Sequence, residues 1–139
     1  MKSLLFGILA AASLVLSFDC HALISVEFVS KERAKELGVT FKIHRNGEAG
    51  YAVTMDFEKK GELEKITYVR LQLGQGKERI MSSQLRVTDP KPGTQSVRFS
   101  AFPAYLPESY LMIVVYNGPK GDVGYRFKVE EFLDLKDME

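Results

Sequence analysis

Cysteine, histidine and paired carboxylates are the side chains that could do chemistry in this sequence, and they are few. The chain has one cysteine and two histidines, and Cys20 and His21 are neighbours. Because zinc usually needs at least three protein ligands, this pair alone makes no metal site. The other histidine, His44, falls on the polar side of an alternating stretch, where solvent exposure is the simplest interpretation. We therefore predict no metal site.

Motifs of nucleophilic catalysis are absent from the sequence. It contains neither G-x-S-x-G nor H-E-x-x-H, so triad chemistry and common zinc hydrolysis lack their parts. Gly74-Gln75-Gly76 precedes Lys77 but lacks the spacing of a phosphate-binding loop, and a hairpin turn explains it better. We expect no catalytic residue of these classes and no cofactor.

Carboxylates alone could still support hydrolysis, because glycosidases need only two at a defined separation. Asp56 and Glu58 fall on one face of an expected strand, roughly 7 Å apart by strand geometry. Lysines such as Lys42, Lys59 and Lys60 are close in sequence. Cross-strand ion pairing on a solvated face explains these acids more simply, so a carboxylate-only hydrolase ranks last among the functions considered.

The N-terminus has the three-part layout of a secretory signal peptide. Lys2 precedes an uncharged stretch from Leu4 to Leu16, and a short polar segment follows. The apolar stretch would reach only about 20 Å as a helix, short of the roughly 30 Å hydrocarbon core of a bilayer. We predict cleavage after Ala22, with Cys20 as the small residue three positions before the cut. An uncleaved anchor is the alternative.

Lipidation and disulfide formation both depend on Cys20. Phe18 and Asp19 do not fit the small residues that precede the cysteine of bacterial lipoproteins. After the predicted cleavage no cysteine remains, so stability must come from packing and backbone pairing. The formal net charge of +1, with both signs interspersed, predicts neither a nucleic-acid-binding stripe nor a polybasic membrane patch. We expect a secreted or periplasmic protein without membrane insertion once the signal is cleaved.

Downstream of the leader, apolar residues recur with a period of two between short turns, which predicts strands almost throughout. One or two helical turns are expected near residues 31–37, capped by Ser30 and ended by Gly38. The segment 89–93 has two prolines and is expected to be a loop. Leu111 to Val115 is apolar on both faces, which indicates a central strand covered on both sides. The expected strands are 24–28, 39–44, 51–58, 66–73, 79–87, 96–102, 111–115 and 123–129.

About eight strands with short connections predict an all-β fold, an antiparallel β-sandwich, with a small antiparallel β-barrel as the alternative. Residues 106–112, Leu-Pro-Glu-Ser-Tyr-Leu-Met, resemble the tyrosine corner of immunoglobulin-like and fibronectin-like sandwiches. The resemblance covers these residues only, and it implies that the Tyr110 hydroxyl bonds to an upstream backbone group. Residues 1–22 are expected to be the signal peptide, 23–132 a single domain and 133–139 a polar tail.

A small exported domain without catalytic parts is expected to be a non-enzymatic binding or structural module. It would contact a protein or glycan partner through loops or an open sheet edge. The alternative is a carrier of a small apolar ligand, with Tyr51, Met55, Phe57 and Phe127 lining a barrel cavity. The residues expected to contact a partner are Phe102, Tyr105, Asn117, Lys120, Asp122 and Tyr125.

Overall fold

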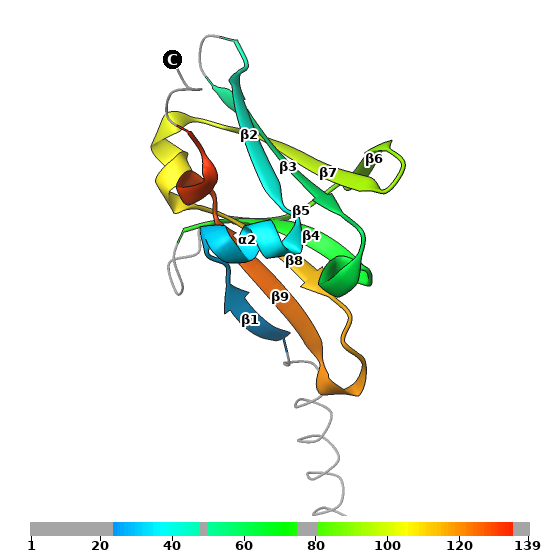
Figure 1. Ribbon diagram of the computed structural model, residues 1–139. Coiled ribbons are helices and arrows are strands. Elements are labelled where there is room, and N and C mark those ends of the chain that lie inside the picture. Colours follow the sequence, from blue (N-terminus) through cyan, green and yellow to red (C-terminus); the bar gives the residue numbers. More distant parts are fainter. Residues whose placement is uncertain (1–23, 48–49, 75–80, 135–139) are drawn as a thin grey trace, which may run out of the picture.

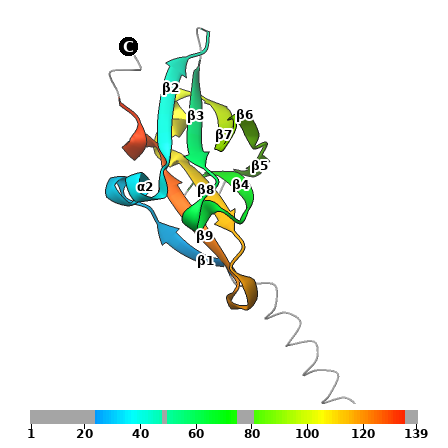
Figure 2. The same ribbon diagram turned by 45° about the vertical axis from the view of Figure 1, so that its right-hand side comes forward.

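Two β-sheets pack face to face in the computed structural model, which describes residues 24–47, 50–74 and 81–134. Figure 1 shows β2, β3, β6 and β7 in one layer, with β1, β9, β8 and β4 in the other, and Figure 2 shows the same layers after a turn. The strands form two separate sheets, which confirms the predicted sandwich. The alternative of a closed barrel is wrong.

Sheet A has the strand order β1-β9-β8-β4-β5, and sheet B has the order β2-β3-β7-β6. The strands of sheet A are β1 (Ile24–Phe28), β4 (Ile66–Leu73), β5 (Met81–Leu85), β8 (Ser109–Val115) and β9 (Asp122–Lys128). Those of sheet B are β2 (Thr40–Arg45), β3 (Tyr51–Glu58), β6 (Thr88–Lys91) and β7 (Thr94–Ala101). The alternating stretches of the sequence thus became strands almost as expected.

Short helices connect the strands or follow them. Helix α2 (Lys31–Leu37) begins where the Ser30 side chain accepts from the backbone N–H of Arg33, and it ends at Gly38 with φ of 72°. That left-handed conformation favours glycine, so both predicted caps are confirmed. The short 3-10 helices are η1 (Gly61–Leu63), η3 (Pro103–Glu108), η4 (Gly118–Lys120) and η5 (Val129–Phe132).

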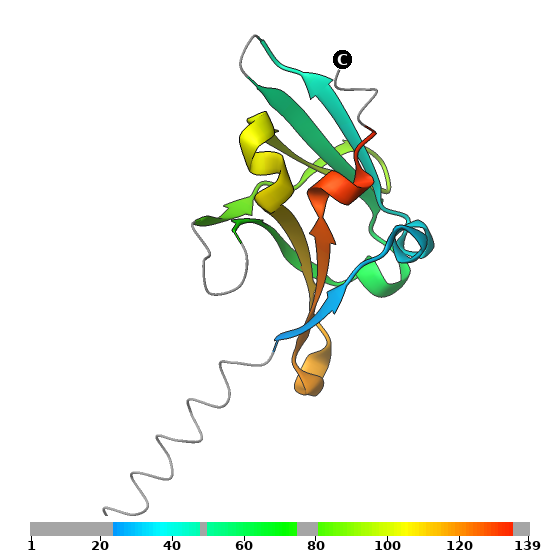
Figure 3. The same cartoon turned by 90° about the vertical axis from the view of Figure 1, so that its left-hand side faces the viewer.

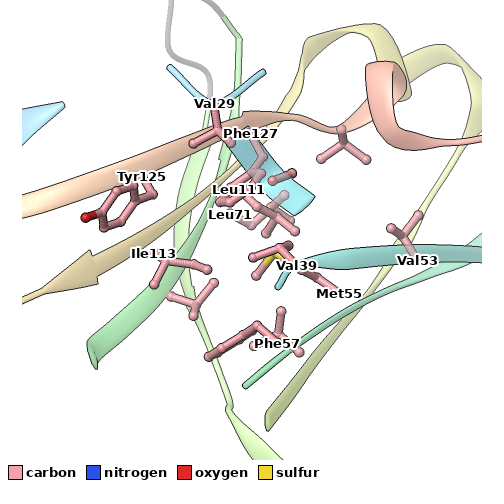
Figure 4. Packing of buried hydrophobic residues seen from close by; sticks show 14 of the residues in the cluster. Val29, Val39, Val53, Met55, Phe57, Leu71, Leu111, Ile113, Tyr125 and Phe127 are labelled. Carbon is pink, nitrogen blue, oxygen red and sulfur yellow. The ribbon is translucent and has the colours of Figure 1, made fainter. Parts of the chain in front are cut away.

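The hydrophobic core lies between the two sheets (Figure 4). Met55, Phe57 and Phe127 are at most 1% exposed and pack among the inward side chains of both sheets. Side chains that fill a core do not line a ligand cavity, so this packing counts against the apolar-ligand carrier. Helices α2, η1, η3 and η5 also direct their buried residues into this core.

Two elements differ from expectation. Strand β1 pairs parallel with β9, so sheet A is not purely antiparallel. The segment expected to be a loop at 89–93 contains most of β6, an edge strand that pairs with β7 at Thr88 and Lys91. Pro90 lies between these two paired positions, and an edge strand tolerates a residue without an N–H because one side of its ladder is open.

The prediction that Tyr110 forms a tyrosine corner is also wrong. Ser109, which is fully buried, donates a hydrogen bond from Oγ to the Tyr105 carbonyl at 2.7 Å. Tyr110 instead lies on the opposite side of β8, under the side chain of Arg126. Serine therefore makes the bond between the start of this strand and the preceding crossing.

The leader with Cys20 and His21, its predicted cleavage after Ala22, and the end of the tail lie outside the described residues. Within the described ranges, no helix has both the length and the apolar character needed to cross a bilayer.

Candidate functional site

The residues predicted to contact a partner do not form one site. Phe102 and Tyr105 belong to the crossing at η3, whereas Asn117, Lys120 and Asp122 belong to the loop around η4. Figure 3 shows these two segments, yellow and orange, at opposite ends of the molecule. Phe102 and Tyr105 are both exposed, with ring centres 6.4 Å apart in an edge-to-face pair.

Tyr125 is only 7% exposed and belongs to the core, so little of its side chain reaches the surface. Its edge lines an open groove of about 560 Å³ beside the η4 loop, together with Glu62, Lys65 and Asn117. Burial, and after it the charges of Glu62 and Glu27, raise the pKa of the Tyr125 phenol. The phenol of Tyr125 therefore stays neutral at physiological pH.

Arg33 joins four elements near this groove. Its guanidinium donates to Glu27 of β1 at 2.8 Å, to Glu36 of α2 at 3.2 Å and to Glu62 of η1. It also lies 6.0 Å from the centre of the Tyr125 ring on β9. The hydrogen bond to Glu27 is the main reason that the pKa of Arg33 stands above its usual value. Three carboxylates share this one cation, so the cluster links the four elements and leaves the Arg33 charge paired.

The outer face of sheet B carries the acids weighed for hydrolysis, and each has a lysine beside it. Lys42 lies 3.9 Å from Asp56, and Glu58 pairs with Lys60. The expected cross-strand pairing is confirmed for Asp56, whereas Glu58 pairs with a lysine two residues further along the chain. His44 is exposed and accepts from Arg98 at 3.2 Å. No cluster of metal-ligating side chains occurs within the ranges that the structure describes.

The outer face of sheet A has a different character. Tyr110, Met112 and Val114 of β8 are at most 8% exposed, yet they lie outside the core cluster. In the part of the chain that is described, the buried residues of every helix point into the core, so side chains of neighbouring strands bury these residues. We call this surface the arginine face and define it by Phe28, Tyr68, Arg70, Tyr110, Met112 and Arg126.

Two arginines flank Met112 in one cross-strand row. Arg70 of β4 and Arg126 of β9 are both register partners of Met112, and Phe28 of β1 continues the row beyond Arg126. The guanidinium carbon of Arg126 lies 4.2 Å from the ring centre of Tyr110 and 5.5 Å from that of Phe28. That of Arg70 lies 5.5 Å from the ring centre of Tyr68. Aromatic rings therefore hold both cations in place.

Neither arginine has a carboxylate partner among the described residues. Both Nε atoms are buried without a hydrogen bond, while the two side chains keep intermediate exposure. The solvent-exposed part of each arginine therefore does not include its Nε atom. Lys128, further along β9, pairs with Glu130 at 3.2 Å, and this contact raises the pKa of Lys128.

Sequence reasoning missed the arginine face. The apolar character of residues 111–115 did indicate burial on both sides of the strand, but it suggested a covering element instead of neighbouring side chains. Arg70, Met112 and Arg126 come from three strands, and only the register brings them together. Cation–aromatic pairs on the polar faces of strands are the one signal that could have drawn attention to them.

No protein-family model, no curated protein and no solved structure matches this chain.

Proposed function

We propose that this chain is an exported, non-enzymatic β-sandwich that binds a protein partner through the arginine face. The observation that carries the proposal is the row Arg70, Met112 and Arg126, in which two cations flank an apolar centre and have no acidic partner among the residues that the structure describes. Arginine, tyrosine and phenylalanine are enriched at protein interfaces, and arginine and tyrosine also among the residues that dominate binding energy.

Three further features support this proposal. Phe28, Val26 and Ile24 of β1 are exposed and extend the apolar surface beside Arg126. The acids of sheet B are paired, which argues against carboxylate hydrolysis. The leader-like N-terminus supports export to a periplasm or out of the cell.

The strand order supports an immunoglobulin-like topology for the module. Sheet B has the order β2-β3-β7-β6, which corresponds to strands A, B, E and D of that architecture, and β9, β8 and β4 correspond to G, F and C. The domain departs from antibody domains because it has no tryptophan and a single cysteine. We use the term for the architecture and not for a family.

Site-specific photo-crosslinking in the native host tests the proposal. A photoreactive phenylalanine analogue at Gln84, the register partner of Arg70, should crosslink to one discrete protein. The same analogue at Lys42 on sheet B is the matched control and should not. The product should disappear when Arg70→Gln and Arg126→Gln are combined. Equal crosslinking from both sheets, or a product unaffected by the arginines, would contradict binding through this face.

A glycan is the second candidate partner, favoured by the exposed pair Phe102 and Tyr105. Sugar rings stack on aromatic faces, although the lack of tryptophan weakens this alternative. Crosslinking from position 102 but not from 84, or retention on a polysaccharide column that is lost in Phe102→Ala, would favour it over the arginine face.

A further inference from the structure

The positions of the two arginines restrict which chemical groups of a partner can bind to the arginine face. This inference rests on the proposed function. The side chains of Arg126 and Arg70 extend in different directions from the row that they share with Met112. Arg126 lies over Tyr110, whereas Arg70 lies over Tyr68. Tyr68 is the register partner of Val114, four residues along β8 from Tyr110. With about 3.3 Å per residue and about 4.8 Å between strands, the Cα atoms of Tyr68 and Tyr110 are roughly 14 Å apart.

The two arginines are themselves separated by two strand spacings, roughly 10 Å between Cα atoms. The positive charges therefore lie roughly 10 to 14 Å apart, with Met112 between them. A single carboxylate cannot reach both guanidinium groups. The face instead matches two anionic groups separated by an apolar one.

An extended segment that runs along β8 has this spacing. Its residues i and i+4 point to the same side and are about 13 Å apart, and residue i+2 lies between them. Residues i and i+2 are only about 7 Å apart, which is too short. In a helix, residues i and i+4 rise by only about 6 Å. The alternation Tyr110, Met112, Val114 has the same period of two as such a segment.

We infer that the arginine face recognises an extended acidic segment of a partner protein, in which two carboxylates four residues apart flank an apolar side chain. Charge complementarity favours this occupant, because the arginine face itself contains no acid, and Asp122, beside Ile24, is the one acid among the described strand residues on this side of sheet A. A second copy of the chain would place arginine against arginine, which disfavours self-association.

Titration of the purified protein with three nine-residue peptides, followed by NMR, tests the inference. The first contains Glu-Thr-Leu-Thr-Glu, the second has the same composition with the glutamates two residues apart, and the third replaces both glutamates by lysine. Such short peptides form little helix on their own. The first should shift the signals of Arg70, Met112 and Arg126, and the second should bind about tenfold more weakly, because one charge-assisted hydrogen bond is lost. The lysine peptide should not bind.

Variants and a vesicle control complete the test. Arg126→Gln and, separately, Arg70→Gln should each weaken the first peptide about tenfold, while Arg98→Gln on sheet B should leave it unchanged. Thermal melts confirm that each variant is folded. Equal binding of both glutamate spacings, binding of the lysine peptide, concentration-dependent dimerisation through this face, or sedimentation with anionic phosphatidylglycerol vesicles in place of peptide binding would each overturn the inference.

The two proposals fail in different ways. If position 84 crosslinks to a protein but the peptide spacing has no effect, the inference about the acidic segment is wrong and the proposed function stands. If position 84 yields no crosslink dependent on Arg70 and Arg126, the proposed function itself is wrong.

Discussion

The guanidinium carbon of Arg126 lies 4.2 Å from the centre of the Tyr110 ring, on the side of sheet A that faces away from the core. This contact explains how Tyr110 is only 8% exposed although no helix in the described part of the chain covers it. The aliphatic part of an arginine can bury apolar surface while its charge stays near water. A long cationic side chain thus replaces a covering element.

The hydrogen bond at the start of β8 allows the contributions of Ser109 and Tyr110 to stability to be compared directly. Ser109→Ala should lower the free energy of unfolding by about 1 kcal/mol, because it removes the hydrogen bond from the buried Ser109 hydroxyl to the Tyr105 carbonyl. Tyr110→Phe should change it by less than about 0.5 kcal/mol, since the ring under Arg126 is kept. Urea denaturation measures both values. The opposite order would restore the tyrosine corner.

Gly124 leaves room for the side chain of Met112 on the outer face of sheet A. A Cβ at this position would lie 2.8 Å from Met112 Sδ and 3.3 Å from Ile24 Cγ2. Gly124→Ala should destabilise the fold by about 1 kcal/mol through overpacking. The double variant Gly124→Ala with Met112→Ala should lose less stability than the sum of the losses of the two single variants. Simple additivity in this double-mutant cycle would mean that the two residues do not interact.

Arg33 is the side chain on which three carboxylates converge. Arg33→Met keeps the apolar stem but leaves Glu27, Glu36 and Glu62 without their shared cation. Because the group is partly exposed, we expect a loss of about 1 kcal/mol at low salt, and a smaller loss in 1 M salt, where screening weakens repulsion among the acids. Lys42→Met, which removes an exposed pair, is the control and should have no measurable effect. A loss independent of salt would point to packing instead of charge.

The raised pKa of Tyr125 predicts that the stability of the fold depends on pH in the alkaline range. This pKa is raised chiefly by burial and then by Glu62 and Glu27, so the folded state favours the neutral phenol. The contribution of the neutral phenol to the stability of the folded state is complete below the usual tyrosine pKa of about 10. It is lost as the pH rises through the raised pKa of Tyr125. Tyr125→Phe should therefore lose stability less steeply above pH 10, as measured by urea midpoints from pH 8 to 11. Parallel curves for the two proteins would show that Tyr125 does not contribute.

The fold could be predicted from the sequence where one face of an element is buried. Strands 51–58 and 66–73 and the capped helix near 31–37 were confirmed, because alternation and capping residues are local signals. In the segment 89–93, residues 89–91 were wrongly predicted to be a loop, since prolines exclude a central strand but not an edge strand. Residues 92 and 93 do form a turn. The parallel pairing of β1 with β9 joins the two ends of the chain, and no local pattern encodes it.

The candidate site was not predicted, and the reason is physical. Phe102, Tyr105, Asn117, Lys120 and Asp122 were chosen because they stand in loops, but the sandwich places them at opposite ends. The arginine face depends on how three strands align, and a shift of one residue would turn Arg70 or Arg126 to the other side. Whether the loop residues contact a partner stays a prediction.

The pairing of β1 with β9 has a consequence for the order of folding. Ile24 lies opposite Asp122, so sheet A gains this edge strand only after the chain has been synthesised through β9. Contacts between such distant segments raise the contact order and slow folding. Until β9 is in place, Phe28 lacks its neighbour Arg126 and the first strand has no partner in sheet A. Removal of β9 should therefore release β1, which makes protease sensitivity near Phe28 a reporter of whether β9 is in place.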